Sequence, residues 1–132
     1  MIGELAHKHV FIDFYMEHCA YCYYIMDDFN RLIDEMTAMY GEENCAFLKI
    51  DGMQIRGLAN LYKVTSYPKF VYILPDTEGK SYTVFGNQQR TYENIRKWMI
   101  GYMGTPPAAA VVTPPAVRVA QVSSSRSANS GY

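Results

Sequence analysis

The chain has 132 residues, which is the length of one ordinary domain and leaves little room for two. Hydrophobic residues make up 49% of it and aromatic residues 14%, so a core can form and wholesale disorder is excluded. The formal net charge of -1 argues against a dedicated nucleic-acid binder, and no apolar run approaches the roughly 20 residues that span a bilayer.

The first predicted element is a strand over residues 9–15, a short aromatic and β-branched run that is typical of a buried strand in an α/β sheet. An amphipathic helix of about five turns follows from Cys19 to about Tyr40, because apolar residues recur there at helical spacing. Gly41 predicts the end of this helix.

The remaining elements are shorter. Strands are predicted over 45–50, 70–74 and 81–85, and a short helix over 54–62 with Ile55, Leu58 and Leu61 facing inward.

A last helix begins after Thr91, a good N-cap, and carries Glu93 in its first turn. Its predicted inner side is lined by Ile95, Trp98, Met99 and Tyr102. Two parallel crossovers followed by a hairpin predict an α/β fold with a mixed four-stranded sheet flanked by helices.

The chain changes character at Gly104. All 13 acidic residues precede it, and the segment that follows is rich in proline, alanine and serine and carries two arginines as its only charges. We therefore predict a folded domain over 1–103 and a tail or linker over 104–132. Its stretch 117–122 alternates apolar and polar residues, which favours addition as a strand to a partner's sheet edge.

Two of the three cysteines form a Cys-x-x-Cys motif, Cys19-Ala20-Tyr21-Cys22, between the first strand and the long helix. The free amides and the dipole at a helix N-terminus stabilise a thiolate, so we expect Cys19 to be the exposed nucleophile with a lowered pKa. Cys22, one turn further, is placed to attack a mixed disulfide and release the partner.

Other interpretations of the cysteines are open. The pair could be half of a zinc site, although a second pair of ligands at metal spacing is absent, or it could be simple core packing. We expect Cys45, at the start of the second strand, to be a buried core thiol. We expect no bound metal or cofactor.

Asp13 interrupts the apolar first strand, six residues before Cys19. A carboxylate there must lose its hydration, which raises its pKa and keeps a proton available for exchange with Cys22. The alternative is a polar group at a strand end that is satisfied by hydrogen bonds.

Several segments together resemble the thioredoxin-fold superfamily, and within it the redox-active domain of protein disulfide isomerases. The resemblance covers roughly residues 9–103. The superfamily likeness is carried by Phe11–Tyr15, Cys19–Cys22, Phe47–Asp51 and Val64–Phe70, and the isomerase likeness by Phe14-Tyr15, Ser66-Tyr67-Pro68, Arg90-Thr91 and Lys97-Trp98-Met99.

The resemblance implies a role for each matching residue. Cys19 would attack, Cys22 would resolve, and Asp13 would be the buried acid that relays a proton. Pro68 would be a cis-proline facing the disulfide, a conformation that proline tolerates at low cost. Tyr67 would present its backbone to an extended substrate. For Arg90, the resemblance implies an arginine that swings in to lower the pKa of the resolving cysteine; a solvated surface arginine is the alternative.

The chain also departs from the isomerase pattern. His18 stands where that branch has tryptophan, and Ala20-Tyr21 stands in place of Gly-His. Tyr21 before the second cysteine is more similar to glutaredoxin, and with His18 it is a candidate for substrate contact. His18 could favour a thiolate when protonated, so activity is expected to depend on pH near neutrality.

The usual leading strand and helix are reduced to the residues before His9, which leaves one sheet edge without its usual partner.

The first functional hypothesis is thiol–disulfide exchange with protein dithiol or disulfide substrates through Cys19 and Cys22. The alternative is an accessory or scaffold subunit of a larger assembly, contacted by residues 104–132, with the dithiol idle or structural. Glutathione-linked exchange is a third hypothesis, suggested by Tyr21 alone. The resemblance implies the secretory lumen, whereas residues 1–8 do not form a secretory signal and so indicate the cytosol or an organelle matrix.

Overall fold

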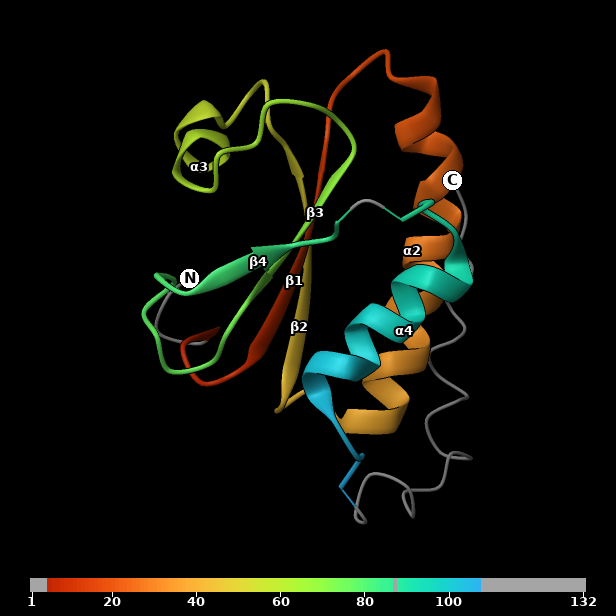
Figure 1. The fold of residues 1–132 in the computed structure, drawn as a ribbon, viewed down its shortest axis with the longest axis vertical. Coiled ribbons are helices and arrows are strands. Elements are labelled where there is room, and N and C mark those ends of the chain that lie inside the picture. Colours follow the sequence, from red (N-terminus) through yellow and green to blue (C-terminus); the bar gives the residue numbers. More distant parts are fainter. Residues whose placement is uncertain (1–4, 87, 108–132) are drawn as a thin grey trace.

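A computed structural model describes residues 5–86 and 88–107 and shows one sheet with helices on both faces (Figure 1). Four strands form the sheet, with a long helix between the first and second strands and a short helix between the second and third along the chain. The elements are β1 His9–Tyr15, α2 Ala20–Tyr40, β2 Cys45–Asp51, α3 Arg56–Leu61, β3 Lys69–Ile73, β4 Tyr82–Val84 and α4 Tyr92–Met103.

The strands lie in the order β2-β1-β3-β4. β1 and β2 run parallel, with His9 opposite Cys45 and Tyr15 opposite Asp51, whereas β3 pairs antiparallel with both β1 and β4. The predicted mixed four-stranded sheet is confirmed, but the expectation of two parallel crossovers is wrong. The segment from α3 to Pro68 returns the chain to the other side of β1 in the opposite direction, so only the first crossover is parallel.

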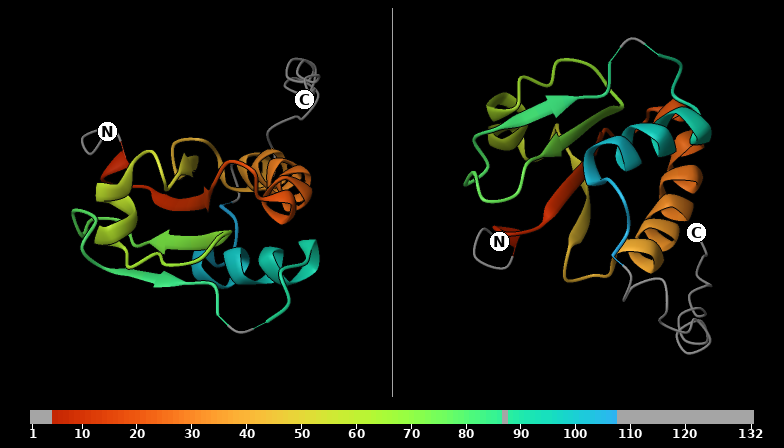
Figure 2. Two further views of the ribbon diagram at one scale, coloured as in Figure 1. Left: turned by 90° about the horizontal axis from the view of Figure 1, so that it is seen from above. Right: turned by 60° about the horizontal axis from the view of Figure 1, so that its bottom comes forward.

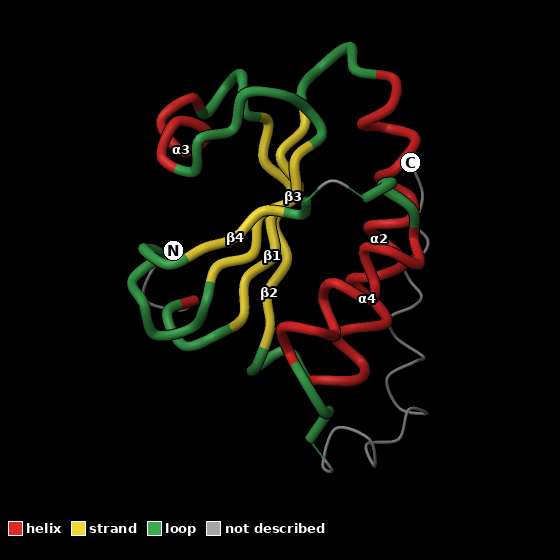
Figure 3. The backbone as a smooth tube through the Cα atoms, viewed as in Figure 1, coloured by secondary structure: helices red, strands yellow, loops and turns green. Residues whose placement is uncertain are grey.

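Helices α2 and α4 cover one face of the sheet and α3 covers the other, as the views in Figures 2 and 3 show. The alternation of side chains along β1 explains the two cores, because Phe11 joins the cluster under α2 and α4 while Val10, Ile12 and Phe14 join the cluster under α3. Asp13, two residues after Phe11, therefore lies on the α2 face of the sheet.

Helix α2 follows the predicted pattern closely. Its buried side is formed by apolar residues one turn apart, and Gly41 at its C-cap adopts a φ of 88°, which favours glycine. The buried residues of the helix are Cys22, Ile25, Met26, Phe29, Leu32, Met36 and Tyr40.

Helix α3 is shorter than expected and presents a different side to the sheet. Ile55 and Leu61, both predicted to face inward, are 48% and 59% exposed, so that prediction is wrong. With only six residues in the helix, Ala59 is its buried member and Leu58 is partly buried, while Tyr62 and Val64 beyond its end fill the space on the sheet.

Helix α4 begins as predicted, since the Thr91 hydroxyl accepts a hydrogen bond from the Asn94 amide at 3.1 Å. Ile95 and Met99 are fully buried and Trp98 partly buried. Tyr102 is 42% exposed, contrary to its predicted inward position, and one face of its ring stacks on the buried Tyr72 with ring centroids 4.5 Å apart.

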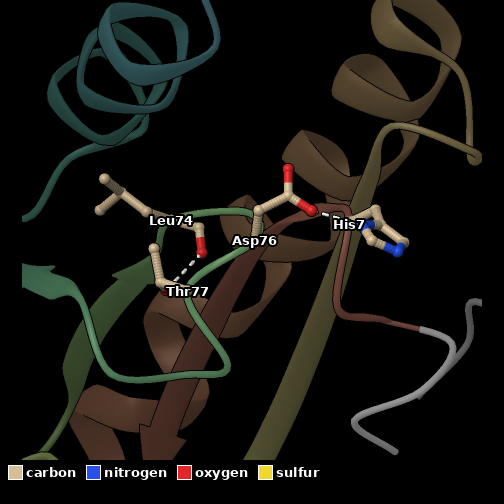
Figure 4. Close-up of polar contacts among 4 residues, drawn as sticks. All are labelled: His7, Leu74, Asp76 and Thr77. Atoms are coloured by element: carbon tan, nitrogen blue, oxygen red, sulfur yellow. Dashed lines mark hydrogen bonds and ion pairs between the residues drawn. The ribbon is translucent and has the colours of Figure 1, made fainter.

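Hydrogen bonds connect the loop after β3 to the segment that precedes β1 (Figure 4). The Asp76 amide donates to the Ala6 carbonyl at 2.7 Å, and the Asp76 carboxylate pairs with His7 Nδ1. The Thr77 hydroxyl closes the turn by donating to the Leu74 carbonyl at 2.9 Å. These contacts lie at the end of the sheet opposite the cysteine motif, since His9 begins β1 and Cys19 follows its far end.

Two expectations concern the margins of the described chain. Within residues 5–86 and 88–107, the outer edge of β2 has no strand partner. The predicted tail lies mostly outside the described residues, and so does the alternating stretch 117–122. No helix in the described part of the chain is both long enough and apolar enough to cross a membrane.

Candidate active site

The Cys-x-x-Cys motif lies where β1 gives way to α2. A short turn ends at His18, which has a left-handed φ of 66°, and Cys19 then caps the helix in extended conformation. The Cys19 sulfur accepts a hydrogen bond from the Cys22 amide at 3.2 Å. The sulfur is therefore held against the free amides of the helix N-terminus, where a thiolate is stabilised.

Cys19 and Cys22 are joined by a disulfide, and their Cα atoms are 5.3 Å apart. The two sulfurs differ in access, because Cys19 is partly exposed whereas Cys22 is fully buried. An incoming thiol or disulfide can therefore reach the Cys19 sulfur from solvent. The Cys22 sulfur is not accessible to it and can react only with the neighbouring Cys19 sulfur.

Cys45 is separate from this pair. It is buried at the start of β2, and its thiol donates to the Gly41 carbonyl at 3.5 Å. Burial raises the pKa of Cys45 to about 11, so the thiolate is scarce at neutral pH. Among the residues that the structure describes, no group of three or more histidine, cysteine or acidic side chains is arranged to hold a metal ion.

Asp13 is fully buried, and neither of its carboxylate oxygens has a hydrogen-bond partner. Burial raises its pKa to about 7, against a smaller opposing effect of the Lys49 charge. The sequence-based alternative of a satisfied polar group at a strand end is therefore wrong. An unsatisfied carboxyl with this pKa is equipped to exchange a proton near neutral pH.

The segment before β3, which contains Tyr67 and Pro68, is the second part of the predicted site. The peptide bond between Tyr67 and Pro68 is cis. Tyr67 is half-buried, and its ring packs so closely on Gly52 that a Cβ atom there would overlap with it. Gly52 is thus a supporting residue that sequence reasoning missed, since nothing in the sequence shows that a distant tyrosine lies against it.

Arg90 contacts both the cysteine motif and this segment. Its Nη1 atom donates to the Pro68 carbonyl at 3.0 Å, and its guanidinium carbon lies 5.1 Å from the centroid of the Tyr21 ring. The Tyr21 hydroxyl in turn donates to the Arg90 carbonyl at 3.3 Å. The alternative of a freely solvated arginine does not fit these contacts.

The structure brings some of the predicted site residues into contact and leaves others apart. Tyr21, Arg90 and Pro68 are in contact around the motif, whereas Asp13 lies beneath the sheet surface on the face that α2 covers. His18 is exposed at the rim. The sequence also places Tyr24 close to the motif, as part of a candidate aromatic contact surface, and its ring stacks on that of Tyr21 with centroids 6.0 Å apart.

Comparison with known proteins identifies the family and agrees with the fold. A family model described as Thioredoxin matches residues 2–100. A protein from Oryza sativa subsp. japonica described as protein disulfide isomerase-like 1-4 is 28% identical over 94 residues, which are 71% of this chain. The match spans only 16% of that relative's length.

Solved structures show the same fold. Human ERp44 superposes with a TM-score of 0.63 at 16% identity, covering 74% of this chain and 26% of its own. Fasciola hepatica thioredoxin superposes with a TM-score of 0.60 at 24% identity, covering 76% of this chain and 86% of its own.

Proposed function

The chain belongs to the thioredoxin family, and from that membership we propose that it exchanges disulfides with protein substrates through Cys19 and Cys22. The observation that carries the proposal is the disulfide at the N-terminus of α2, with one partly exposed and one buried sulfur. The family and this geometry support thiol–disulfide exchange in general.

In the direction of substrate reduction, the reduced protein reacts in two steps. The Cys19 thiolate attacks one sulfur of a substrate disulfide, which forms a mixed disulfide and releases the other substrate sulfur as a thiolate. The Cys22 thiolate then attacks the Cys19 sulfur, so the Cys19–Cys22 disulfide forms and the second substrate sulfur leaves. The substrate gains two electrons, the protein loses two, and the reverse sequence oxidises a dithiol.

Asp13 supplies the proton acceptor for the second step in this proposal. Cys22 is buried, so its thiol has no direct access to bulk water, whereas Asp13 lies on the sheet face covered by the helix that carries Cys22. A carboxyl whose pKa is about 7 can accept the thiol proton as the new disulfide forms and later return it.

The substrate lies along the segment of Tyr67 and Pro68 in this proposal. The backbone before Pro68 is available to pair with an extended polypeptide, and the packing of Tyr67 on Gly52 holds it in place. In this proposal His18, which is exposed and precedes Cys19 in the sequence, also contacts the substrate and favours the thiolate when protonated.

The direction of exchange follows from the reduction potential of the couple. A potential of about −270 mV is typical of a reductant, and one of about −180 mV is typical of an isomerase. The isomerase likeness of residues 66–68 and 97–99 favours the higher value.

Catalysed reduction of insulin by dithiothreitol tests the proposal. Wild type is expected to accelerate it, Cys19→Ser to be inactive, and Cys45→Ala to match wild type because that thiol is buried apart from the pair. Equal activity of Cys19→Ser and wild type would overturn the proposal. A folded, reducible wild type without activity would favour the accessory role instead.

A further inference from the structure

Tyr21 occupies an unusual position for a large aromatic residue. It lies between the two cysteines and is 39% exposed, yet its ring is in contact on two sides, with Arg90 at 5.1 Å and with Tyr24 at 6.0 Å. Its hydroxyl also donates to the Arg90 carbonyl at 3.3 Å. One residue of the redox motif therefore contacts both the charge and the backbone of Arg90.

Arg90 also contacts the substrate segment, by which we mean Tyr67 and Pro68, where the substrate lies in the proposed function. Its guanidinium donates to the Pro68 carbonyl at 3.0 Å, and a hydrogen bond from a charged donor is stronger than one between neutral groups. An arginine has three donor nitrogens and a flexible stem, so a second contact is needed to fix its orientation. The face of the Tyr21 ring provides that contact through a cation–π interaction.

We propose that Tyr21 is a positioning residue that holds Arg90 on the Pro68 carbonyl and thereby fixes the substrate segment relative to the Cys19–Cys22 pair. The inference rests on the proposed function, because it concerns how the same site receives a polypeptide. A substrate that pairs with the backbone at Tyr67 needs this segment in place. A small disulfide that reacts with Cys19 alone does not.

A second arginine makes the same kind of contact with a tyrosine ring but does not reach the substrate segment. Arg31 also lies over a tyrosine, with its guanidinium carbon 4.0 Å from the centroid of the Tyr92 ring. That pair joins α2 to α4, and the hydroxyl of Tyr92 donates to Glu35. Neither residue of the pair has a hydrogen bond to the substrate segment, so Arg31 offers a matched control.

The experiment compares kcat/KM for a peptide that contains a disulfide with kcat/KM for hydroxyethyl disulfide. Tyr21→Leu removes the ring face, and its kcat/KM for the peptide is expected to fall about threefold to fivefold, mainly through KM. Its kcat/KM for hydroxyethyl disulfide is expected to fall by a clearly smaller factor than its kcat/KM for the peptide. Tyr21→Phe keeps the ring and is expected to restore the peptide rate, and Arg31→Leu is expected to match wild type on both substrates.

A double-mutant cycle on the peptide substrate tests the coupling. Because Tyr21 acts through Arg90, the variant with both Tyr21→Leu and Arg90→Met is expected to be no slower than Arg90→Met alone. Three results would each overturn the inference. They are a double variant in which the two single losses in kcat/KM multiply, an unchanged peptide rate in Tyr21→Leu, and equal losses on both substrates. A wild type that is inactive on both substrates would instead overturn the proposed function, so the two failures are distinguishable.

Discussion

Asp13 lies directly opposite Lys49 in the parallel register of β1 and β2, but the lysine does not bond to the carboxylate. Lys49 Nζ instead donates to the Asn30 side-chain oxygen at 2.7 Å, on the surface of the molecule. The lysine charge lowers the pKa of Asp13 only in part, and burial raises it to about 7. The core thus contains a carboxyl group that receives no hydrogen bond from the described residues, which makes its ionised form costly to bury.

The first prediction concerns stability and pH. In the unfolded chain Asp13 ionises near its ordinary pKa of 3.8, whereas in the folded chain it ionises near 7. The folded state therefore binds more protons between these values, and the contribution of Asp13 becomes steadily more destabilising as the pH rises through this window. From pH 5 to pH 8 this loss is about 2–3 kcal/mol.

Urea denaturation of wild type and Asp13→Asn at pH 5 and pH 8 measures this loss. The amide cannot ionise, so the variant is expected to gain stability relative to wild type by that amount between the two pH values. A difference between the two proteins that is the same at both pH values would contradict the assignment of the raised pKa to Asp13.

The second prediction concerns the resolving step. If Asp13 accepts the Cys22 proton, the decay of the mixed disulfide should accelerate as the pH rises through about 7, where the carboxyl becomes ionised. Stopped-flow measurement of this decay in Asp13→Asn is expected to show a slower step without that inflection. An unchanged profile in the variant would assign the proton to another acceptor.

The elements of the fold were largely predictable from local pattern. The run of β-branched and aromatic residues at 9–15 and the helical spacing after Cys19 each depend on side chains that are close in sequence. The raised pKa of Asp13 was predictable too, because a charged residue within an apolar strand loses its hydration wherever the strand lies.

Features that depend on contacts between residues far apart in the sequence could not be predicted from local pattern. The direction of β3 depends on how the chain leaves α3, and the exposure of Ile55 and Leu61 depends on which side of that short helix meets the sheet. The contact of Tyr21 with Arg90 joins residues 69 positions apart, which spacing along the chain cannot reveal. The roles of the site residues remain predictions.

The third prediction concerns cysteine reactivity. After reduction, iodoacetamide is expected to alkylate Cys19 rapidly at neutral pH, while Cys45 in the native protein stays unmodified because it is buried and burial raises its pKa to about 11. Mass spectrometry of proteolytic fragments measures both sites. Denatured protein is the control, in which Cys45 should react; rapid labelling of native Cys45 would contradict its placement in the core.

The fourth prediction concerns the start of α4. Thr91→Ala removes the oxygen that accepts the Asn94 amide, and is expected to lower the free energy of unfolding by about 1 kcal/mol. Thr91→Ser keeps that oxygen and should stay near wild type in the same urea titration. Equal losses in both variants would show that the methyl group, and not the cap, is responsible.

Capture of the mixed disulfide tests the central claim most directly. Reduced Cys22→Ser retains the nucleophile without the resolving thiol, so on mixing with an oxidised protein substrate it is expected to form a stable adduct at Cys19, seen on a non-reducing gel and located by mass spectrometry. Reduced Cys19→Ser is expected to form none, since Cys22 is fully buried. An adduct that forms equally in Cys19→Ser, or its absence from Cys22→Ser, would contradict exchange through Cys19.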